Sequence, residues 1–226
     1  MLIPGRALVL PRFFSIAQCE RWVRGVYDGR EEWTEDFGGE QFCLGRAFYT
    51  HLEEDREDDY FDAPEDSDAV VERWTPGLQA AMRELIARVT KGRVVQRRGW
   101  CGPGVHVFPP GEPVAERGGV CHFDTEGLVA DHLARRLPAI TIVAMFQPAA
   151  SGGGLKLWDT LYDGRDHPTD AELAAPSEVF EYGVGDVIAI DSYRLHQIQP
   201  FGGDRERISA TVHAAEVDPG LWETWF

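Results

Sequence analysis

The chain has 226 residues, of which 43% are hydrophobic and 27% charged, and this composition excludes a disordered or fibrous protein. Its 38 acidic residues outnumber 22 lysines and arginines, which gives a net charge of −16. Nucleic acids and anionic membranes are bound by clustered basic residues, so we expect neither as a partner and expect a neutral or cationic small-molecule substrate.

The cysteines and the start of the chain bear on the compartment. Four cysteines are widely spaced and form no C-x-x-C pair: Cys19, Cys43, Cys101 and Cys121. The apolar run at residues 7–10 stops at Pro11, which is too short for a secretory leader. These features predict reduced thiols and a cytoplasmic location. No apolar stretch is long enough to predict a membrane span.

The first expected element is an amphipathic helix. Ser15 and Gln18 match the S-x-x-Q capping box. Apolar residues then recur at helical spacing up to Gly29, namely Ile16, Cys19, Trp22, Val23 and Val26. The following segment 38–49 mixes Gly with Phe and Leu, and its pattern is compatible with either a strand or a loop.

An acidic segment occupies residues 53–68. It contains ten Asp or Glu residues and one Arg, so it carries −9 of the net charge of −16. Such a run of charge favours a solvated loop. The alternative is a lid or an acidic collar that attracts a cationic substrate to a binding site.

A second helix is expected after the acidic segment. Thr75 can cap it, with Pro76 at its first position, and Gly92 stops it. Its apolar face comprises Leu78, Ala81, Met82, Leu85, Ile86 and Val89.

Beyond Gly92 the hydrophobic period changes from about 3.6 to 2, which predicts strands. No repeat or low-complexity linker divides the chain, so we expect a single domain, 1–226, mainly β with N-terminal helices. Its helical part is 1–92, with the acidic loop 53–68, and its core is a jelly roll, or double-stranded β-helix, in 93–226. The nine expected strands are 93–97, 104–108, 120–124, 139–146, 155–158, 178–182, 186–190, 195–199 and 207–214.

Two His-x-acid motifs occur, His51-Leu52-Glu53 and His122-Phe123-Asp124. Roughly one is expected by chance, so the surroundings must decide. The first runs into the acidic segment, where its side chains would be mobile and hydrated, and we expect no function for it. The second lies in an expected strand, where a period of 2 places His122 and Asp124 on one face, able to share a metal.

A third ligand and a carboxylate-binding pair follow in the sequence. His196 begins a strand that comes after the expected strand 186–190 and a turn. Arg207 and Ser209 then share a strand face, and together they offer a guanidinium fork and a hydroxyl to a carboxylate beside the metal. Two histidines and one carboxylate on one side of iron leave positions for O2 and a chelating cosubstrate.

At these residues the chain resembles the Fe(II)- and 2-oxoglutarate-dependent oxygenases with prolyl-hydroxylase-like or phytanoyl-like cores. The family pattern of His-x-Asp, a distal His and Arg-x-Ser reads here as His122, Asp124, His196, Arg207 and Ser209, within about residues 100–216. The turn and strand 152–158 is also similar to that of family members.

The resemblance implies the cofactors and the roles of these residues. Fe(II) would be bound by the catalytic triad His122, Asp124 and His196, with 2-oxoglutarate and O2 as cosubstrates. The C5 carboxylate of 2-oxoglutarate would pair with Arg207 and Ser209. In the family's halogenases a small residue replaces the metal-binding carboxylate, so Asp124 argues against a halogenase.

Three further residues are weaker candidates. His106 and Thr141 lie in strands near the motif and could hydrogen-bond 2-oxoglutarate; a core histidine and plain β propensity are the alternatives. Trp158 is a candidate for substrate binding, and a buried core aromatic is its alternative.

We therefore expect a dioxygenase of specialised, natural-product metabolism that oxidises an unactivated C–H bond of a small molecule by hydroxylation, desaturation or oxidative cyclisation. The acidic balance favours an amine-bearing substrate such as an amino acid or an aminoglycoside. The alternative is a metal-binding jelly roll of the cupin type, an isomerase or a ligand-binding protein. It would use the same three metal ligands but would not need Arg207 and Ser209.

Overall fold

The computed structural model describes residues 7–226. Its helices are α1 (Ile16–Asp28), α2 (Phe48–Glu53), α3 (Glu57–Phe61), α4 (Pro64–Trp74), α5 (Leu78–Thr90), α6 (Pro113–Arg117), α7 (Ala130–Arg135) and α8 (Asp170–Leu173), with 3-10 turns at Arg30–Glu32 and Phe37–Gly39. Its strands are β1 (Leu8–Leu10), β2 (Thr34–Asp36), β3 (Gln41–Leu44), β4 (Arg93–Gln96), β5 (Gly104–Phe108), β6 (Ala139–Gln147), β7 (Ser151–Gly152), β8 (Leu155–Leu161), β9 (Ser177–Phe180), β10 (Val187–Asp191), β11 (Arg194–Ile198), β12 (Phe201–Gly202), β13 (Arg207–Asp218) and β14 (Leu221–Trp225).

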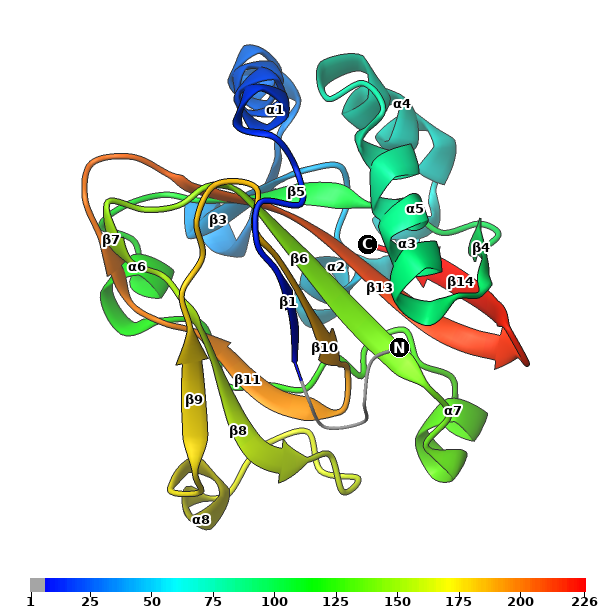
Figure 1. Ribbon diagram of the computed structural model, residues 1–226. Coiled ribbons are helices and arrows are strands. Elements are labelled where there is room, and N and C mark those ends of the chain that lie inside the picture. Colours follow the sequence, from blue (N-terminus) through cyan, green and yellow to red (C-terminus); the bar gives the residue numbers. More distant parts are fainter. Residues whose placement is uncertain (1–6) are drawn as a thin grey trace.

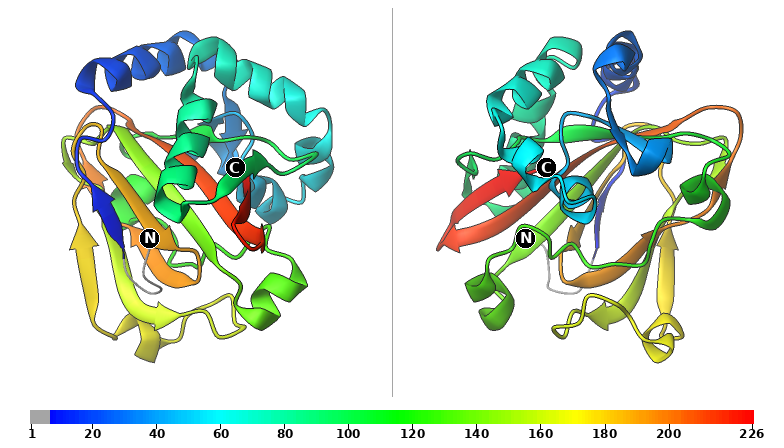
Figure 2. Two further views of the ribbon diagram at one scale, coloured as in Figure 1. Left: turned by 45° about the vertical axis from the view of Figure 1, so that its right-hand side comes forward. Right: turned by 180° about the vertical axis from the view of Figure 1, so that it is seen from behind.

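The strands form one large and two small sheets. The large sheet has the order β1-β10-β6-β13-β5-β3-β2, with β14 pairing with β13 and β4 lying parallel to β14. The small sheets are β11-β8-β9 and β12-β7. Helices α1, α4 and α5 lie beside the large sheet at the end of the molecule away from β8, β9 and β11 (Figures 1 and 2). The predicted class, mainly β with N-terminal helices, is confirmed.

The long strand β13 separates the hydrophobic core from a cavity, because side chains alternate between the two faces of a strand. Its even-numbered residues from Ile208 to Ala214 pack with apolar residues of α1 and α5. Its odd-numbered residues from Arg207 to His213 line the cavity. Strands β5 and β6, which pair with β13 on its two sides over this stretch, alternate in the same way.

Both expected helices are present, although the second begins later than predicted. The Ser15 hydroxyl accepts a hydrogen bond from the backbone N–H of Gln18 at 3.2 Å, so Ser15 is the N-cap of α1. Helix α5 begins after Gly77, whose positive φ of 77° turns the chain into the helix. Thr75 ends α4 instead, and its hydroxyl donates to the Val71 carbonyl at 2.7 Å. The prediction that Thr75 caps α5 was therefore wrong.

The acidic segment 53–68 is largely helical, so the prediction of a solvated loop was wrong. Acidic residues fill the first turns of α3 and α4, and Pro64 is the first residue of α4. Carboxylates are stabilised by the partial positive charge of a helix N-terminus, and Pro suits the first helical position. The only Arg of the segment, Arg56, binds Asp36 at 2.9 Å and also binds Glu54.

Eight of the nine expected strands are present as β4, β5, β6, β8, β9, β10, β11 and β13. The expected strand 120–124 is wrong, because His122 pairs with His196 only as an isolated bridge. The structure also contains strands of two to five residues that were not predicted, including β3 within the unassigned segment 38–49.

Two further findings concern membranes and thiols. In the part of the chain that the structure describes, none of the helices combines the length and apolar character that crossing a membrane requires. All four cysteines are free thiols.

Candidate metal centre

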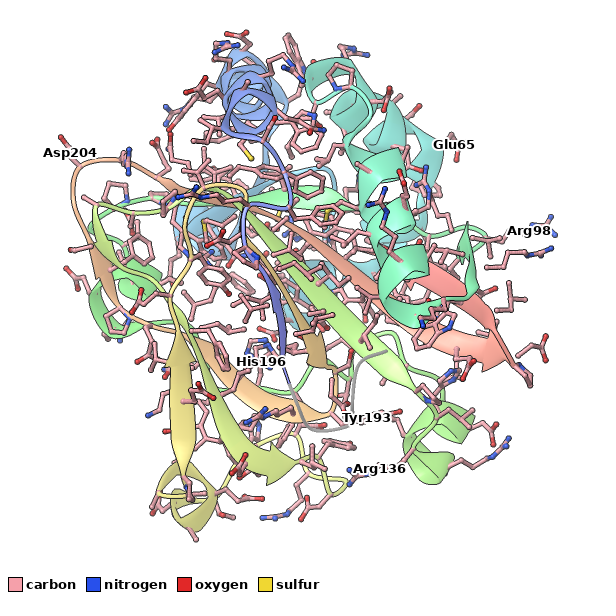
Figure 3. All side chains as sticks on the ribbon, viewed as in Figure 1. Glu65, Arg98, Arg136, Tyr193, His196 and Asp204 are labelled. Atoms are coloured by element: carbon pink, nitrogen blue, oxygen red, sulfur yellow. The ribbon has the colours of Figure 1, made fainter. Side chains whose placement is uncertain are left out.

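Three side chains meet where the loop before α7 contacts β11. His122, Asp124 and His196 each bring one potential ligand atom to within 4.8 Å of the others. Nε2 of His122 lies 3.4 Å from Oδ1 of Asp124, and Nε2 of His196 lies 3.3 Å from Oδ2. Figure 3 shows His196 inside the molecule, whereas Glu65 and Asp204 lie at its edge.

Backbone hydrogen bonds hold the loop against β11. The N–H of His122 donates to the carbonyl of His196 at 3.1 Å, and the reciprocal bond is 3.0 Å. The N–H of Asp124 donates to the carbonyl of Ser192 at 2.9 Å. These bonds fix both ends of the His-x-Asp motif relative to the distal histidine, although the motif is not in a regular strand.

Each histidine is oriented by its second ring nitrogen. Nδ1 of His122 donates to the carbonyl of Val120 at 2.8 Å, and Nδ1 of His196 donates to the carbonyl of Arg194 at 2.9 Å. A ring that donates from Nδ1 leaves the Nε2 lone pair for a metal, as is usual for metal-binding histidines.

The electrostatics of the three residues suit a cation. Burial opposes ionisation of Asp124, but the charge of His196 and the close contacts with both histidines hold the pKa of Asp124 well below its usual range. Burial alone lowers the pKa of His122, yet the hydrogen bond and charge of Asp124 raise it to about 9. Oδ2 of Asp124 is buried without a hydrogen-bond partner. This set of two imidazoles and one carboxylate fits Fe(II) or a similar divalent metal.

The triad lines a cavity of about 370 Å³ that also contains Arg207. Arg207 is only 1% exposed. Its Nε donates to the carbonyl of Gly153 at 3.2 Å and its Nη1 to the hydroxyl of Ser209 at 3.1 Å, whereas Nη2 has no partner. The Tyr182 hydroxyl is also buried without a partner, and its ring centroid lies 5.5 Å from the guanidinium carbon. An anion with several acceptor oxygens would satisfy these donors.

His106 and Thr141 line the same cavity and bind other side chains. Nδ1 of His106 lies 3.1 Å from the sulfur of Cys43. Burial, with added repulsion from His213 and Arg207, lowers the pKa of His106 to about 3, so the ring is neutral. The Thr141 hydroxyl lies 3.0 Å from Nδ1 of His213 and 3.1 Å from the Ser192 hydroxyl. Both residues can offer neutral hydrogen-bonding groups to a bound molecule.

Two expectations about individual residues were wrong. His51 does not join the triad, but it is not mobile and hydrated either: it is buried on α2, and its Nδ1 donates to the Ala47 carbonyl at 2.8 Å. Trp158 does not line the cavity, and the alternative for this residue, a buried core aromatic, is what the structure shows. It belongs to a separate core cluster that includes Phe123, and its Nε1 donates to the carbonyl of Leu173 at 2.9 Å.

Several cavity residues are not among those predicted from the sequence. Glu126 continues the period-2 pattern of His122 and Asp124, a signal that could have identified it. Burial, with added repulsion from Asp124 and Glu53 and opposed by His122, raises the pKa of Glu126 to about 7. Other missed residues, which have no motif around them, are Phe37, Glu40, Phe48, Tyr49 and Tyr182.

Solved structures similar to this chain include oxygenases whose names or complexes mention α-ketoglutarate, another name for 2-oxoglutarate. The carbocyclase SnoK from nogalamycin biosynthesis is 13% identical with a TM-score of 0.61, over 94% of this chain and 80% of that chain. An N-substituted L-amino acid dioxygenase from Burkholderia ambifaria AMMD is 14% identical with a TM-score of 0.60, over 97% and 86%. Its complex with α-ketoglutarate is 12% identical with a TM-score of 0.59, over 97% and 86%.

A more distant structural match is a prolyl hydroxylase from Trichoplax adhaerens, solved with a peptide fragment of hypoxia inducible factor. It is 11% identical with a TM-score of 0.51, over 91% of this chain and 81% of that chain. No family model and no curated protein matches the sequence. The chain has the double-stranded β-helix fold of the 2-oxoglutarate-dependent oxygenases, which confirms the predicted jelly roll and the fold that the resemblance implied.

Proposed function

We propose that this protein is an Fe(II)- and 2-oxoglutarate-dependent dioxygenase that oxidises a C–H bond of a small molecule. The observation that carries the proposal is the presence, in one cavity, of a His-Asp-His triad and a buried arginine with an unpaired donor. Solved structures of the same fold that carry out α-ketoglutarate-dependent reactions support it.

Each residue of the triad has a defined part in this function. His122, Asp124 and His196 would hold Fe(II), and the backbone carbonyls behind the histidines keep both rings in the metal-binding orientation. When bound, Fe(II) supplies the activation of O2 that is coupled to decarboxylation of 2-oxoglutarate to succinate and CO2.

The rest of the cavity would position 2-oxoglutarate. Arg207 offers the unpaired Nη2, and Ser209 and Tyr182 offer hydroxyls around the same point. Thr141 and the neutral His106 add donors or acceptors without adding charge. Because this part of the cavity is buried, the charge-assisted hydrogen bonds would form away from water and would be correspondingly strong.

Succinate formation in air tests this function. The protein is incubated with Fe(II) and 2-oxoglutarate, with and without a panel of small organic molecules, and succinate is quantified. We expect Fe(II)-dependent succinate from the wild type, and loss of most iron and nearly all succinate in each of H122A, D124A and H196A. The control H51Q changes a buried histidine outside the triad and should retain activity.

Two results would contradict the assignment. Full activity in any triad variant would remove that residue from the metal site. Iron binding without succinate under all conditions would favour a cupin-type metal protein, which would use the triad but not Arg207.

A further inference from the structure

The cavity is lined by one buried positive charge and by three more exposed carboxylates. Arg207 is 1% exposed and lies deep in it. Glu40, Glu53 and Glu126 line the same cavity; Glu53 is exposed and the other two are half-buried, so these three carboxylates lie toward its solvent end. We call Glu40, Glu53 and Glu126 the carboxylate rim.

The carboxylate rim is not neutralised by the protein. Among residues 7–226, no Lys or Arg forms an ion pair with a rim carboxylate, whereas other acidic groups are paired, such as Asp36 with Arg56 and Glu32 with Arg73. Glu53 and Glu126 line the same cavity, so both carboxylates are available to a molecule bound there. An opposite charge nearby stabilises a carboxylate, so these groups favour a bound cation.

Aromatic side chains lie beside the rim. Phe37, Phe48 and Tyr49 line the cavity and come from the same N-terminal segment as Glu40 and Glu53. We call these three residues the aromatic wall. Aromatic faces attract organic cations and also bury apolar groups. The wall and the rim therefore favour the same ligand, a cation attached to an apolar body.

Among the described residues, the cavity offers no second Lys or Arg to pair with a carboxylate on the substrate. Arg207 is the only Lys or Arg that lines it among the described residues, and the proposed function assigns Arg207 to 2-oxoglutarate. A substrate carboxylate would remain unpaired and would be repelled by the rim. Amino acids are therefore disfavoured, although they are amines.

Resting on the proposed function, we infer that the substrate is an organic amine without a carboxylate, whose ammonium group binds at the carboxylate rim and whose apolar part contacts the aromatic wall. The inference is more specific than one from the overall acidity of the chain, because it assigns the selectivity for an amine substrate to the three carboxylates of the rim. It also separates amines from amino acids.

Matched probes test the substrate class. Phenylalkylamines of different chain length are compared with two matched sets, the alcohols of the same length and the amino acids that add a carboxylate to the amine. One such trio is the amine 3-phenylpropylamine, the alcohol 3-phenylpropan-1-ol and the amino acid homophenylalanine. Dissociation constants are measured calorimetrically without O2 on protein loaded with Fe(II) and 2-oxoglutarate. The tightest amine should bind roughly ten- to a hundredfold more tightly than any alcohol or amino acid.

Two triple variants, each of which removes three negative charges, test whether the preference for amines depends on the carboxylate rim. E40Q/E53Q/E126Q should lose most of the preference for amines. D58N/E65Q/D66N, which neutralises three carboxylates outside the cavity lining, should keep it. An alcohol or amino acid that binds as tightly as the amines, an amine series that does not bind, or equal effects of the two variants would overturn the inference.

The same samples separate this inference from the proposed function. Chelation of Fe(II) by 2-oxoglutarate gives visible absorption, which is recorded before each titration. Absence of that absorption in the wild type would contradict the proposed function. Normal absorption without selectivity for amines would contradict only the substrate class.

Discussion

Arg207 places a guanidinium in an interior where two of its three nitrogens are satisfied and the third is not. A buried charge without an opposite charge destabilises a folded protein, and apolar replacement of such a group is often neutral or stabilising. A bound anion would supply both the opposite charge and a hydrogen-bond acceptor for Nη2. Arg207 is therefore the residue at which stability and ligand binding should oppose each other.

R207M tests this opposition. Without ligand, its free energy of unfolding in urea should equal or exceed that of the wild type. Its affinity for 2-oxoglutarate on Mn(II)-loaded protein should fall by about 2 to 4 kcal/mol, or roughly thirty- to a thousandfold. R207K should recover only part of this loss, because an ammonium group lacks the planar fork.

The other arginines near this position serve as controls. Arg205 is exposed, and Arg194 donates to the carbonyl of Trp158 at 2.8 Å, outside the cavity. R205M should leave 2-oxoglutarate binding unchanged. Unchanged affinity in R207M, or marked destabilisation of its ligand-free form, would show that Arg207 has a structural role instead.

The metal and cosubstrate candidates could be predicted because His122, Asp124, His196, Arg207 and Ser209 form a spaced motif. The rim and the wall could not be, because their members come from separate segments without a motif. Only the folded chain brings Glu53, at the end of α2, near Glu126 in the loop after the metal ligands. Trp158 was misplaced because the sequence does not show which face of β8 meets the cavity.

Among the elements, α1 depends on a close approach to α4. Gly25 lies in the middle of α1, and a β-carbon there would clash with the carbonyl oxygen of Trp74 at the end of α4. Glycine normally weakens a helix relative to alanine. Here the contact between the two helices requires it.

G25A therefore tests the packing of the helical layer. Helix propensity alone predicts that alanine stabilises α1, but the clash should dominate and lower the free energy of unfolding by about 1 to 3 kcal/mol. Urea denaturation measures the change. R24A, at an exposed position of the same helix, should stay within roughly 0.5 kcal/mol of the wild type. Stabilisation of G25A would show that the helices do not pack this closely.

Local patterns predicted the longer elements better than the short ones. Helix α1 and the eight matching strands have clear periodicity and turn residues at their ends. The acidic segment was misread because charge density was taken as a sign of a loop, although Pro64 followed by Glu65 and Asp66 is also a helix-start pattern. Strand 120–124 failed because pairing with β11 stops after one bridge, which alternation along one strand does not reveal.

For the whole molecule, buried histidines set one part of the pH dependence of stability. Burial is the largest cause that lowers the pKa of His51, His106 and His213 below 6.5. Below that pH the unfolded chain takes up protons that the folded protein does not. The unfolding free energy contributed by these groups is therefore present above pH 6.5 and is lost as the pH falls. For His106 the loss extends from pH 6.5 to about pH 3.

H106Q isolates one of these groups in the metal-free protein. Between pH 7 and 5, the wild type should lose about 2 kcal/mol more unfolding free energy than H106Q, because one further proton binds its unfolded chain. The comparison cancels the opposite contribution of His122, whose pKa is raised to about 9. Parallel stability curves for the two proteins would mean that His106 is protonated in the folded state.

The central claim is that 2-oxoglutarate chelates a metal held by the His-Asp-His triad. Its most direct test is the visible charge-transfer absorption of the protein with Fe(II) and 2-oxoglutarate in the absence of O2. We predict that the band appears in the wild type, saturates at one equivalent of iron, is absent in D124A, and requires much more 2-oxoglutarate in R207M. No band in a wild type that has bound one equivalent of iron, or an equal band in D124A, would contradict the claim.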